Sequence, residues 1–178
     1  MDAKQIINVC EEKWDEHKSD CSGFVKAVAA ALGVSTFLPG DNADAIVEKL
    51  PGAATWCAIK SGDGLTAKEH ADSGFLVIGG LKGSDQANPE EHGHVVVVVT
   101  GPLDPGHNKY PTAYWGHLGG VGAKEHTINW AWRAEDRDKV SYFANSLAAP
   151  PATPEPDGSA DDRPSTGVAE VDGGPKKE

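Results

Sequence analysis

Two uninterrupted apolar segments constrain the fold of this chain more than any other feature of its sequence. Residues 75–81 read FLVIGGL and residues 94–99 read HVVVVV. Both are short, rich in aliphatic residues and bounded by glycine, which is typical of central strands that are buried on both faces. The polar segment KGSDQANPEEHG between them predicts a loop. A sheet with such a centre must be covered by other elements of the chain.

Three amphipathic helices are predicted before these strands. Residues 2–17 repeat apolar side chains at three- to four-residue spacing, and so do residues 20–33 within the segment DCSGFVKAVAAALGV. A third, shorter helix is predicted over 41–50, between an Asp-Asn cap and Pro51. Residues 52–73 are less periodic, and no element is predicted there.

The remaining elements are predicted after the second apolar strand. Residues 110–117 (YPTAYWGH) and 127–133 (TINWAWR) suggest two further strands, which makes about four strands in an antiparallel meander. Residues 133–147 predict a closing helix with an apolar face. Trp130 and Trp132 are expected in the core or as lining of a groove. The predicted fold class is therefore α+β, with helices packed on a small antiparallel sheet.

The composition changes sharply after residue 147. Residues 148–178 contain six of the twelve prolines and no aromatic residue, and they are acidic. Such a segment cannot bury enough apolar surface to fold, so we predict one domain over 1–147 and a disordered, acidic, proline-rich tail over 148–178. With 178 residues and 39% hydrophobic content, the chain is long enough for one buried core and is expected to be a monomer.

The formal net charge of −11 argues against binding to nucleic acid or to a membrane surface, because an acidic body repels both. No segment approaches the roughly 18 apolar residues of a membrane span, and the start MDAKQIINVC does not resemble a signal peptide. We therefore expect synthesis in the cytoplasm. An extracytoplasmic target would have to be reached by a route that reads no cleaved signal.

The chain has three cysteines, and Cys21 stands apart from the other two. Cys10 and Cys57 suit the role of small buried hydrophobic residues, and a disulfide between them is an open alternative. Cys21 lies in the first turn of the second helix, beside the capping candidates Asp20 and Ser22. Free N–H groups and the helix dipole favour negative charge there, so a lowered thiol pKa and a role as nucleophile are predicted.

His94 opens the second apolar strand and can supply the imidazole that cysteine acyl transfer requires. A histidine at the lip of a buried strand is held rigidly, and Gly93 leaves room beside it for substrate or for the cysteine helix. If this strand pairs antiparallel with the strand ending at His117, the two histidines become neighbours. His117 could then orient the His94 ring, and the backbone carbonyl of Trp115 could do so equally well.

The histidines also permit a metal site, because alternate residues of a strand share one face. His92 and His94 form such a pair, with His117 and His126 further along the chain. Carboxylate and cysteine ligands at the spacing of a metal site are missing, so neither a metal nor a cofactor is expected. His92 is more simply a loop residue.

Together, Cys21 and His94 predict acyl-transfer chemistry. Hydrolysis of a peptide bond through an acyl-enzyme is the first interpretation, with backbone N–H groups at the helix start stabilising the oxyanion. A transglutaminase-like acyltransferase that transfers the acyl group to an amine would use the same two residues. A non-catalytic module that binds peptide or glycan in a tryptophan-lined groove is the third interpretation.

The segments DCSGFVKAVAAALGV and GHVVVVV resemble the cysteine and histidine motifs of NlpC/P60-type peptidoglycan hydrolases. The finer resemblance is to the first family of type VI secretion amidase effectors, which are interbacterial toxins. It includes GFLVIGGLKG before the histidine strand, GPL and KYP after it, and a closing segment with DRD and a tyrosine near SLA. The similarity covers residues 6–147 and leaves out the tail.

This resemblance implies a papain-like domain that hydrolyses the bond between D-glutamate and diaminopimelate in Gram-negative peptidoglycan, with Cys21 as nucleophile and His94 as base. It also implies injection into the periplasm of a target cell by the type VI secretion apparatus, which agrees with the lack of a signal peptide. A cognate immunity protein is expected to protect the producer, and we expect it to contact the loop over 82–93. Some members are thought to join the N-terminal helix to the chain's end by a disulfide. No cysteine follows Leu147 here, so that bridge is absent.

Overall fold

Strands β2 (Leu76–Leu81) and β3 (His94–Val98) form the middle of the fold, as their apolar sequences predict. The computed structural model describes residues 2–147, and in it every residue of β2 is buried. Successive side chains point to opposite faces of the sheet. Ile78 and Val97 pack into one apolar core, whereas Val77 and Val96 pack into another on the opposite face. The prediction that both strands are buried on both sides is confirmed.

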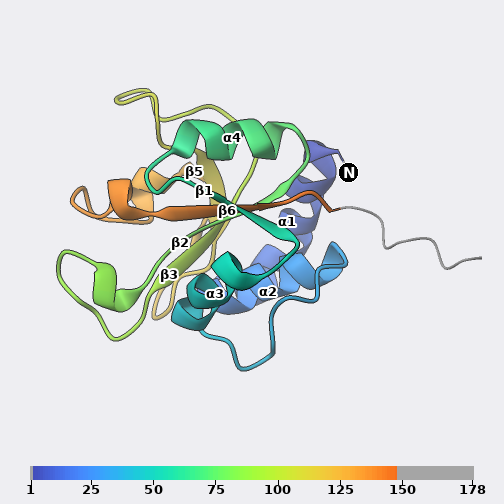
Figure 1. Ribbon diagram of the computed structural model, residues 1–178, viewed down its shortest axis with the longest axis horizontal. Helices are drawn as coiled ribbons and strands as arrows, with labels where there is room; N and C mark the ends of the chain where they lie inside the picture. Colours follow the sequence, from blue (N-terminus) through green and yellow to red (C-terminus); the bar gives the residue numbers. More distant parts are fainter. Residues whose placement is uncertain (1, 148–178) are drawn as a thin grey trace, which may run out of the picture. The chain divides into compact units, whose positions relative to one another are not determined.

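Strands β2 and β3 lie at the centre of a single antiparallel sheet of six strands, in the order β1-β6-β2-β3-β4-β5 (Figure 1). The other four strands are β1 (Trp56–Ile59), β4 (Thr112–Trp115), β5 (Ala123–Thr127) and β6 (Ser141–Asn145). In the pairing of β3 with β4, Val97 lies opposite Tyr114 and Val98 opposite Ala113. Continued by three residues toward the start of β3, this register sets His94 beside the end of β4.

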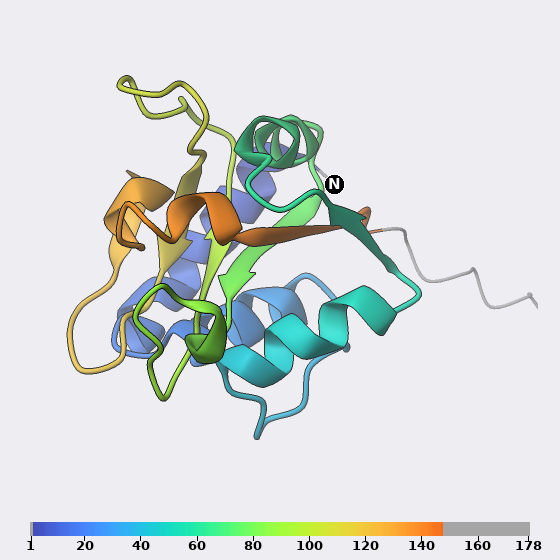
Figure 2. The same cartoon turned by 60° about the vertical axis from the view of Figure 1, so that its left-hand side comes forward.

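Helices cover both faces of the sheet. Helices α1 (Ala3–His17), α2 (Cys21–Ala31) and α3 (Ala43–Lys49) contribute to one core, and α4 (Gly64–Asp72) packs on the opposite face (Figures 1 and 2). The predicted α+β class, with helices on an antiparallel sheet, is confirmed. In the part of the chain that the structure describes, no helix is long and apolar enough to cross a membrane.

The three predicted helices are present, and side-chain caps define their starts. Asp2 forms a capping box with Gln5 at the start of α1. Asp20 caps α2 and Asn42 caps α3, each through its side-chain oxygen. Ser22, the other predicted cap of α2, instead donates its hydroxyl to Asp20. A cap fixes where a helix begins, so α2 starts at the predicted cysteine.

The prediction of a closing helix over residues 133–147 is wrong. Residues 134–136 form a turn, residues 137–139 form the 3₁₀ turn η4 (Arg137–Lys139), and only residues 141–145 form a regular element of any length, strand β6. Phe143 faces one core, and Tyr142 and Ala144 face the other. The middle of β6, residues 142–144, is buried and apolar at every position, so its sequence also satisfies helical spacing. Because of this ambiguity, strand β6, which pairs with both β1 and β2, was predicted as a helix.

The predicted strand over residues 127–133 is also wrong. Strand β5 ends at Thr127, and the 3₁₀ turn η3 (Ile128–Trp130) follows. The guanidinium of Arg137 donates to the carbonyl oxygens of Asn129 (2.8 Å) and Trp132 (3.1 Å). These bonds satisfy backbone carbonyls that would otherwise require a neighbouring strand.

Two elements lie in residues 52–73, where no element was predicted: strand β1 and helix α4. Strand β1 has four residues, and two of them are exposed. Helix α4 buries only the small side chains of Ala67 and Ala71 besides Gly64. Short length and small apolar residues leave little periodicity, although Asp63, which caps α4 by accepting from the Thr66 N–H at 3.1 Å, is a recognisable start signal.

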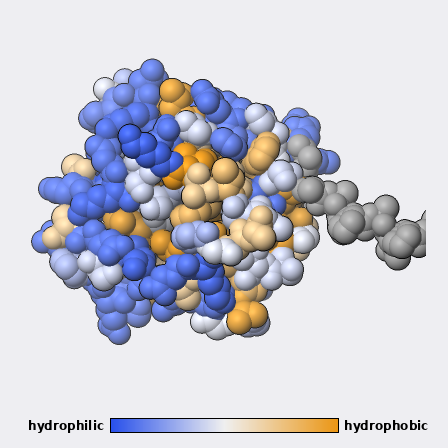
Figure 3. Space-filling model, in the orientation of Figure 1, coloured by the Kyte–Doolittle hydropathy of each residue, from blue (hydrophilic) through white to orange (hydrophobic). Residues whose placement is uncertain are grey.

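All three cysteines are free thiols, so the disulfide alternative for Cys10 and Cys57 is wrong. Cys10 is buried as predicted, whereas Cys57 is exposed on β1. The surface shown in Figure 3 is largely hydrophilic on the side of the loop between β2 and β3, as predicted for that polar segment. The tail predicted over residues 148–178 lies outside the described residues.

Candidate active site

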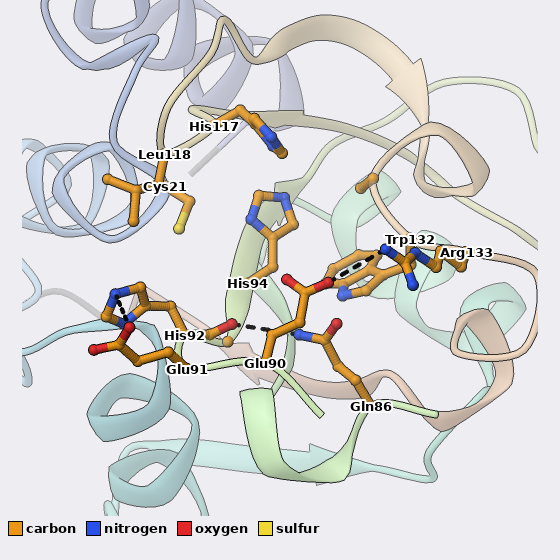
Figure 4. A pocket seen from close by; sticks show the side chains of 12 residues that line it. Cys21, Gln86, Glu90, Glu91, His92, His94, His117, Leu118, Trp132 and Arg133 are labelled. Carbon is orange, nitrogen blue, oxygen red and sulfur yellow. Dashed lines mark hydrogen bonds and ion pairs between the residues drawn. The ribbon is translucent and has the colours of Figure 1, made fainter. Parts of the chain in front are cut away.

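Cys21 and His94 point toward each other at one wall of a pocket of about 480 Å³, although they come from different layers of the fold (Figure 4). Cys21 is the first residue of α2, and His94 is the first residue of β3. Helix α2 packs on the sheet, which brings the two starts together. His117 lines the same pocket. The structure therefore brings all three predicted side chains to one place.

The start of α2 holds Cys21 in position. The carboxylate of Asp20 accepts the N–H of Gly23 at 2.8 Å and the hydroxyl of Ser22 at 2.9 Å. The Phe24 N–H donates to the Asp20 carbonyl at 2.9 Å, which is the first bond of the helix. Because the turn is bonded in this way, Cys21 faces the sheet and only 6% of its surface is exposed.

Burial raises the pKa of the Cys21 thiol above its ordinary value, and the charge of Asp20 acts in the same direction. Backbone N–H groups, first that of Val95, favour the thiolate and oppose this rise. The predicted lowering of the thiol pKa is therefore wrong, because the loss of hydration outweighs the favourable dipole of the helix start.

His94 is held as a neutral imidazole. Burial lowers the pKa of His94 to about 3, and the nearby His117 ring acts in the same direction. Its ring lies edge-on to Trp132, with 5.2 Å between ring centroids. The Nε2 atom is shielded from water and has no hydrogen-bond partner among residues 2–147. A neutral imidazole with one edge toward a thiol has the protonation state of a general base.

The two candidates for the third position lie nearby, but neither bonds to His94. The rings of His94 and His117 are 5.9 Å apart between centroids. The Trp115 carbonyl accepts the indole N–H of Trp14 at 3.2 Å. Orientation of the His94 ring by either group stays a prediction, and packing against Trp132 is the contact that the sequence analysis did not anticipate.

Gly116 brings His117 to the cysteine helix. A Cβ atom at Gly116 would lie 2.2 Å from the carbonyl oxygen of His17, so only glycine permits this close approach. The next residue, His117, donates its backbone N–H to the Lys18 carbonyl at 3.0 Å. The turn after β4 is thereby fixed to the segment just before Cys21.

Gly93 has a structural role besides the one predicted. A Cβ atom there would lie 2.6 Å from the carbonyl oxygen of Leu81 and 2.3 Å from the carboxylate of Asp44, so the close approach of strand β2 and helix α3 requires glycine. Gly93 also lines the pocket, and its role in leaving room for substrate or for the cysteine helix stays a prediction. Asp44 also accepts the N–H of Gly83 at 3.0 Å, so one carboxylate lies at both ends of the loop between β2 and β3.

The outer wall of the pocket is charged, and its residues were not among those predicted from the sequence. Glu90 and Glu91 reach it from the loop between β2 and β3, and Arg133 reaches it from the segment after η3 (Figure 4). Arg133 and Glu90 form an ion pair with 3.5 Å between nitrogen and oxygen. These side chains project from irregular segments, where no periodic pattern draws attention to them.

Buried Asp136 supports this outer wall. It is 1% exposed, and it accepts the Ala87 N–H at 2.6 Å and the Lys139 ammonium at 3.1 Å. The loop between β2 and β3 is thus bonded to the segment that also presents Arg133. Within residues 2–147, no group of three His, Cys, Asp or Glu side chains is arranged to hold a metal ion. His92 is exposed in the loop, as predicted.

Comparison with known proteins identifies the family. No protein-family model matches the chain. The chain is 39% identical over 154 residues to "Peptidoglycan amidase Tse1" of Pseudomonas aeruginosa, an alignment that covers 81% of this chain and 91% of the relative. Similarity of this degree over nearly the whole relative, together with the papain-like arrangement of helix and sheet, shows common descent. The chain therefore belongs to the first family of type VI secretion amidase effectors.

Proposed function

We propose that this protein is a cysteine amidase that hydrolyses the bond between D-glutamate and diaminopimelate in the stem peptides of Gram-negative peptidoglycan. The observation that carries the proposal is the facing pair of Cys21 and His94 in a pocket, in a chain 39% identical to a peptidoglycan amidase. A thiol at a helix start beside a neutral imidazole is the arrangement that nucleophilic acyl transfer needs.

The reaction starts from a neutral pair, because burial raises the pKa of Cys21 and lowers that of His94. As the sulfur of Cys21 bonds to the γ-carbonyl carbon of D-glutamate, its proton passes to His94. His94 then protonates the diaminopimelate nitrogen as the C–N bond breaks, leaving a thioester. Water, deprotonated by His94, attacks the thioester carbon and releases the D-glutamate carboxylate and the thiol.

Backbone N–H groups at the start of α2 are suited to stabilise the oxyanion of this reaction. Capping uses the N–H of Gly23, and the first helical bond uses the N–H of Phe24. The N–H groups of Cys21 and Ser22 favour the thiolate, and so does that of Val95. Donors already held at the reacting centre require no reorganisation when negative charge develops.

The charged outer wall suits the leaving half of this substrate. The diaminopimelate side chain retains an ammonium and a carboxylate beyond the cleaved bond. Arg133 and Glu90 offer opposite charges within one pocket, and their ion pair is exposed enough to be exchanged for pairs with a ligand. A guanidinium binds a carboxylate through paired hydrogen bonds, so Arg133 is the residue we assign to a diaminopimelate carboxylate.

Mass spectrometry of purified muropeptides tests the proposed reaction. We expect the wild type to release fragments separated between D-glutamate and diaminopimelate, with one water added per cleavage, and Cys21→Ala to leave the substrate intact. A conjugate of larger mass would instead identify an acyltransferase. Binding without any product from the wild type would identify a non-catalytic module and refute the mechanism.

We further propose delivery by a type VI secretion apparatus into the periplasm of a target cell, with a cognate immunity protein protecting the producer. The charged loop between β2 and β3 borders the pocket, so a partner seated on it blocks the path to Cys21. Shortening this loop should weaken immunity-protein binding measured by calorimetry. Unchanged affinity would place the partner elsewhere.

A further inference from the structure

A second depression, of about 310 Å³, lies beside the candidate active site. Its lining comes from the turn between β4 and β5 and from η3, and it includes His117, Val121, His126 and Trp130. His117 lines both pockets, so the two adjoin at this residue, and together they are called the groove. Asp, Glu, Lys and Arg are absent from the described residues that line the second depression. The groove therefore has one charged half and one uncharged half.

The uncharged half exposes an unusual amount of apolar surface. Val121 and Trp130, which line this half, are 65% and 74% exposed, and Leu118, which lines the charged half next to His117, is 61% exposed. Trp130 is the most exposed of the large apolar residues in the described part of the chain, although tryptophan is a residue that folding normally covers. Exposed apolar side chains gathered at one place mark a binding surface.

Trp130 is also held rigidly. It ends η3, whose first residue, Ile128, is fully buried. The carbonyl of Asn129 accepts a hydrogen bond from Arg137 at 2.8 Å. His126 lies edge-on to the indole, with 5.7 Å between ring centroids. An indole presented at a pinned turn loses little freedom on binding, which favours a ligand that stacks on its face.

The proposed substrate has two halves that match the two halves of the groove. On the leaving side lies diaminopimelate, which is charged and suits Arg133 and Glu90. On the acyl side, D-glutamate is joined through L-alanine to an N-acetylated sugar, whose ring presents C–H groups and an acetyl methyl. Such a face packs on an aromatic ring without requiring a charged partner.

We propose that the depression around Trp130 is a subsite for the saccharide on the acyl side of the substrate, with a sugar ring stacked on the indole. This inference rests on the proposed function. It adds an orientation, because the sugar-bearing half then lies over η3 and the diaminopimelate half lies over the loop between β2 and β3. The position of the depression directly beside the pocket that holds Cys21, with His117 lining both, is what favours the substrate itself over a separate ligand.

The test compares two substrates that differ only in the sugar: a disaccharide-tetrapeptide and the same tetrapeptide without sugar. For the wild type we expect a higher kcat/KM on the disaccharide-tetrapeptide. In Trp130→Ala the ratio of the two kcat/KM values should fall about tenfold, and Trp130→Phe should retain most of it. Leu38→Ala, at an exposed apolar residue away from the groove, serves as the matched control.

An unchanged ratio in Trp130→Ala would overturn the subsite, and so would an equal loss on both substrates. Loss of immunity-protein binding with an unchanged ratio would overturn it in favour of a protein-binding surface. A wild type that cleaves neither substrate would instead refute the proposed function, so the two failures are distinguishable. Melting temperatures should be equal across the variants, since residue 130 is largely exposed.

Discussion

The candidate active site has an inner wall, which carries Cys21 and His94, and an outer wall, which carries Glu90 and Arg133, and the two are built in different ways. Cys21 and His94 belong to regular elements, and both elements pack into the apolar core. Glu90 and Arg133 belong to irregular segments at the surface, which are held by ion pairs and single hydrogen bonds such as that of Asp136. Burial sets the chemistry of the inner wall, and exposed charge sets that of the outer wall.

This difference separates two properties that one pocket must combine. The inner wall is dry enough to raise the pKa of a thiol and lower that of an imidazole. The outer wall stays hydrated, so its charges can exchange their protein partners for those of a ligand at little cost. We therefore expect changes at the inner wall to affect kcat and changes at the outer wall to affect KM.

The largest expected effect comes from comparing two buried cysteines on neighbouring helices. Cys21→Ala should lower kcat at least about 1,000-fold, because the nucleophile is lost, and should lower the free energy of unfolding by about 1 kcal/mol, because this side chain is also buried. Cys10→Ala should retain activity per folded molecule and lower the free energy of unfolding by about 1 to 2 kcal/mol, because a fully buried side chain is truncated. Turnover assays and urea unfolding measure the two outcomes.

The exposed Cys57→Ser is the matched control for loss of a thiol and should change neither quantity. Comparable activity in Cys21→Ala and wild type would show that Cys21 is not the nucleophile and that the inner wall does not carry out the reaction.

His94→Gln should lower kcat by about 100-fold or more, because glutamine cannot accept the proton of the thiol. It should also change the pH dependence of stability. The folded pKa of His94 is about 3 and its ordinary value is 6.5, so between these values only the unfolded chain binds the proton. Wild-type stability therefore falls as the pH drops below 6.5, by up to about 1.4 kcal/mol per pH unit.

Glutamine does not titrate, so His94→Gln should lose less stability than wild type between pH 6.5 and pH 3. Unfolding curves at several pH values measure this slope. Equal slopes in both proteins would show that the imidazole is hydrated and that the inner wall is not dry.

The same contrast explains what the sequence could predict. The starts of α2 and β3 were recognisable because caps and continuous apolar runs are local signals, and they sufficed to predict Cys21 and His94 as partners. Packing of α2 on the sheet buries the Cys21 thiol and raises its pKa. The helix dipole alone predicted a lowered pKa, which is the wrong direction. Strand β6 was missed because burial on both faces removes the period that separates a strand from a helix. Arg133 and Glu90 become neighbours only through tertiary contacts of Asp136, which no local pattern reveals.

Arg133→Ala should raise KM for diaminopimelate-containing muropeptides about tenfold and leave kcat within about twofold, since loss of one charge-assisted hydrogen bond is worth roughly 1.5 kcal/mol. Steady-state kinetics measure the two constants separately. Lys60→Ala removes an exposed positive charge away from this pocket and should change neither constant. A fall in kcat with an unchanged KM would mean that Arg133 acts on the transition state and that the two walls are not functionally separate.

The smallest expected effect tests whether the two walls also differ in dynamics. Asp136→Asn keeps an oxygen that can accept the Ala87 N–H but removes the charge that pairs with Lys139. We expect a loss of about 1 kcal/mol in stability and a KM increase of about threefold. Hydrogen exchange should quicken at residues 82–93 and stay unchanged in β3, because the loop can open without the core. If protection in β3 falls equally, loop and core open as one cooperative unit, and the outer wall is as much a part of the core as Cys21.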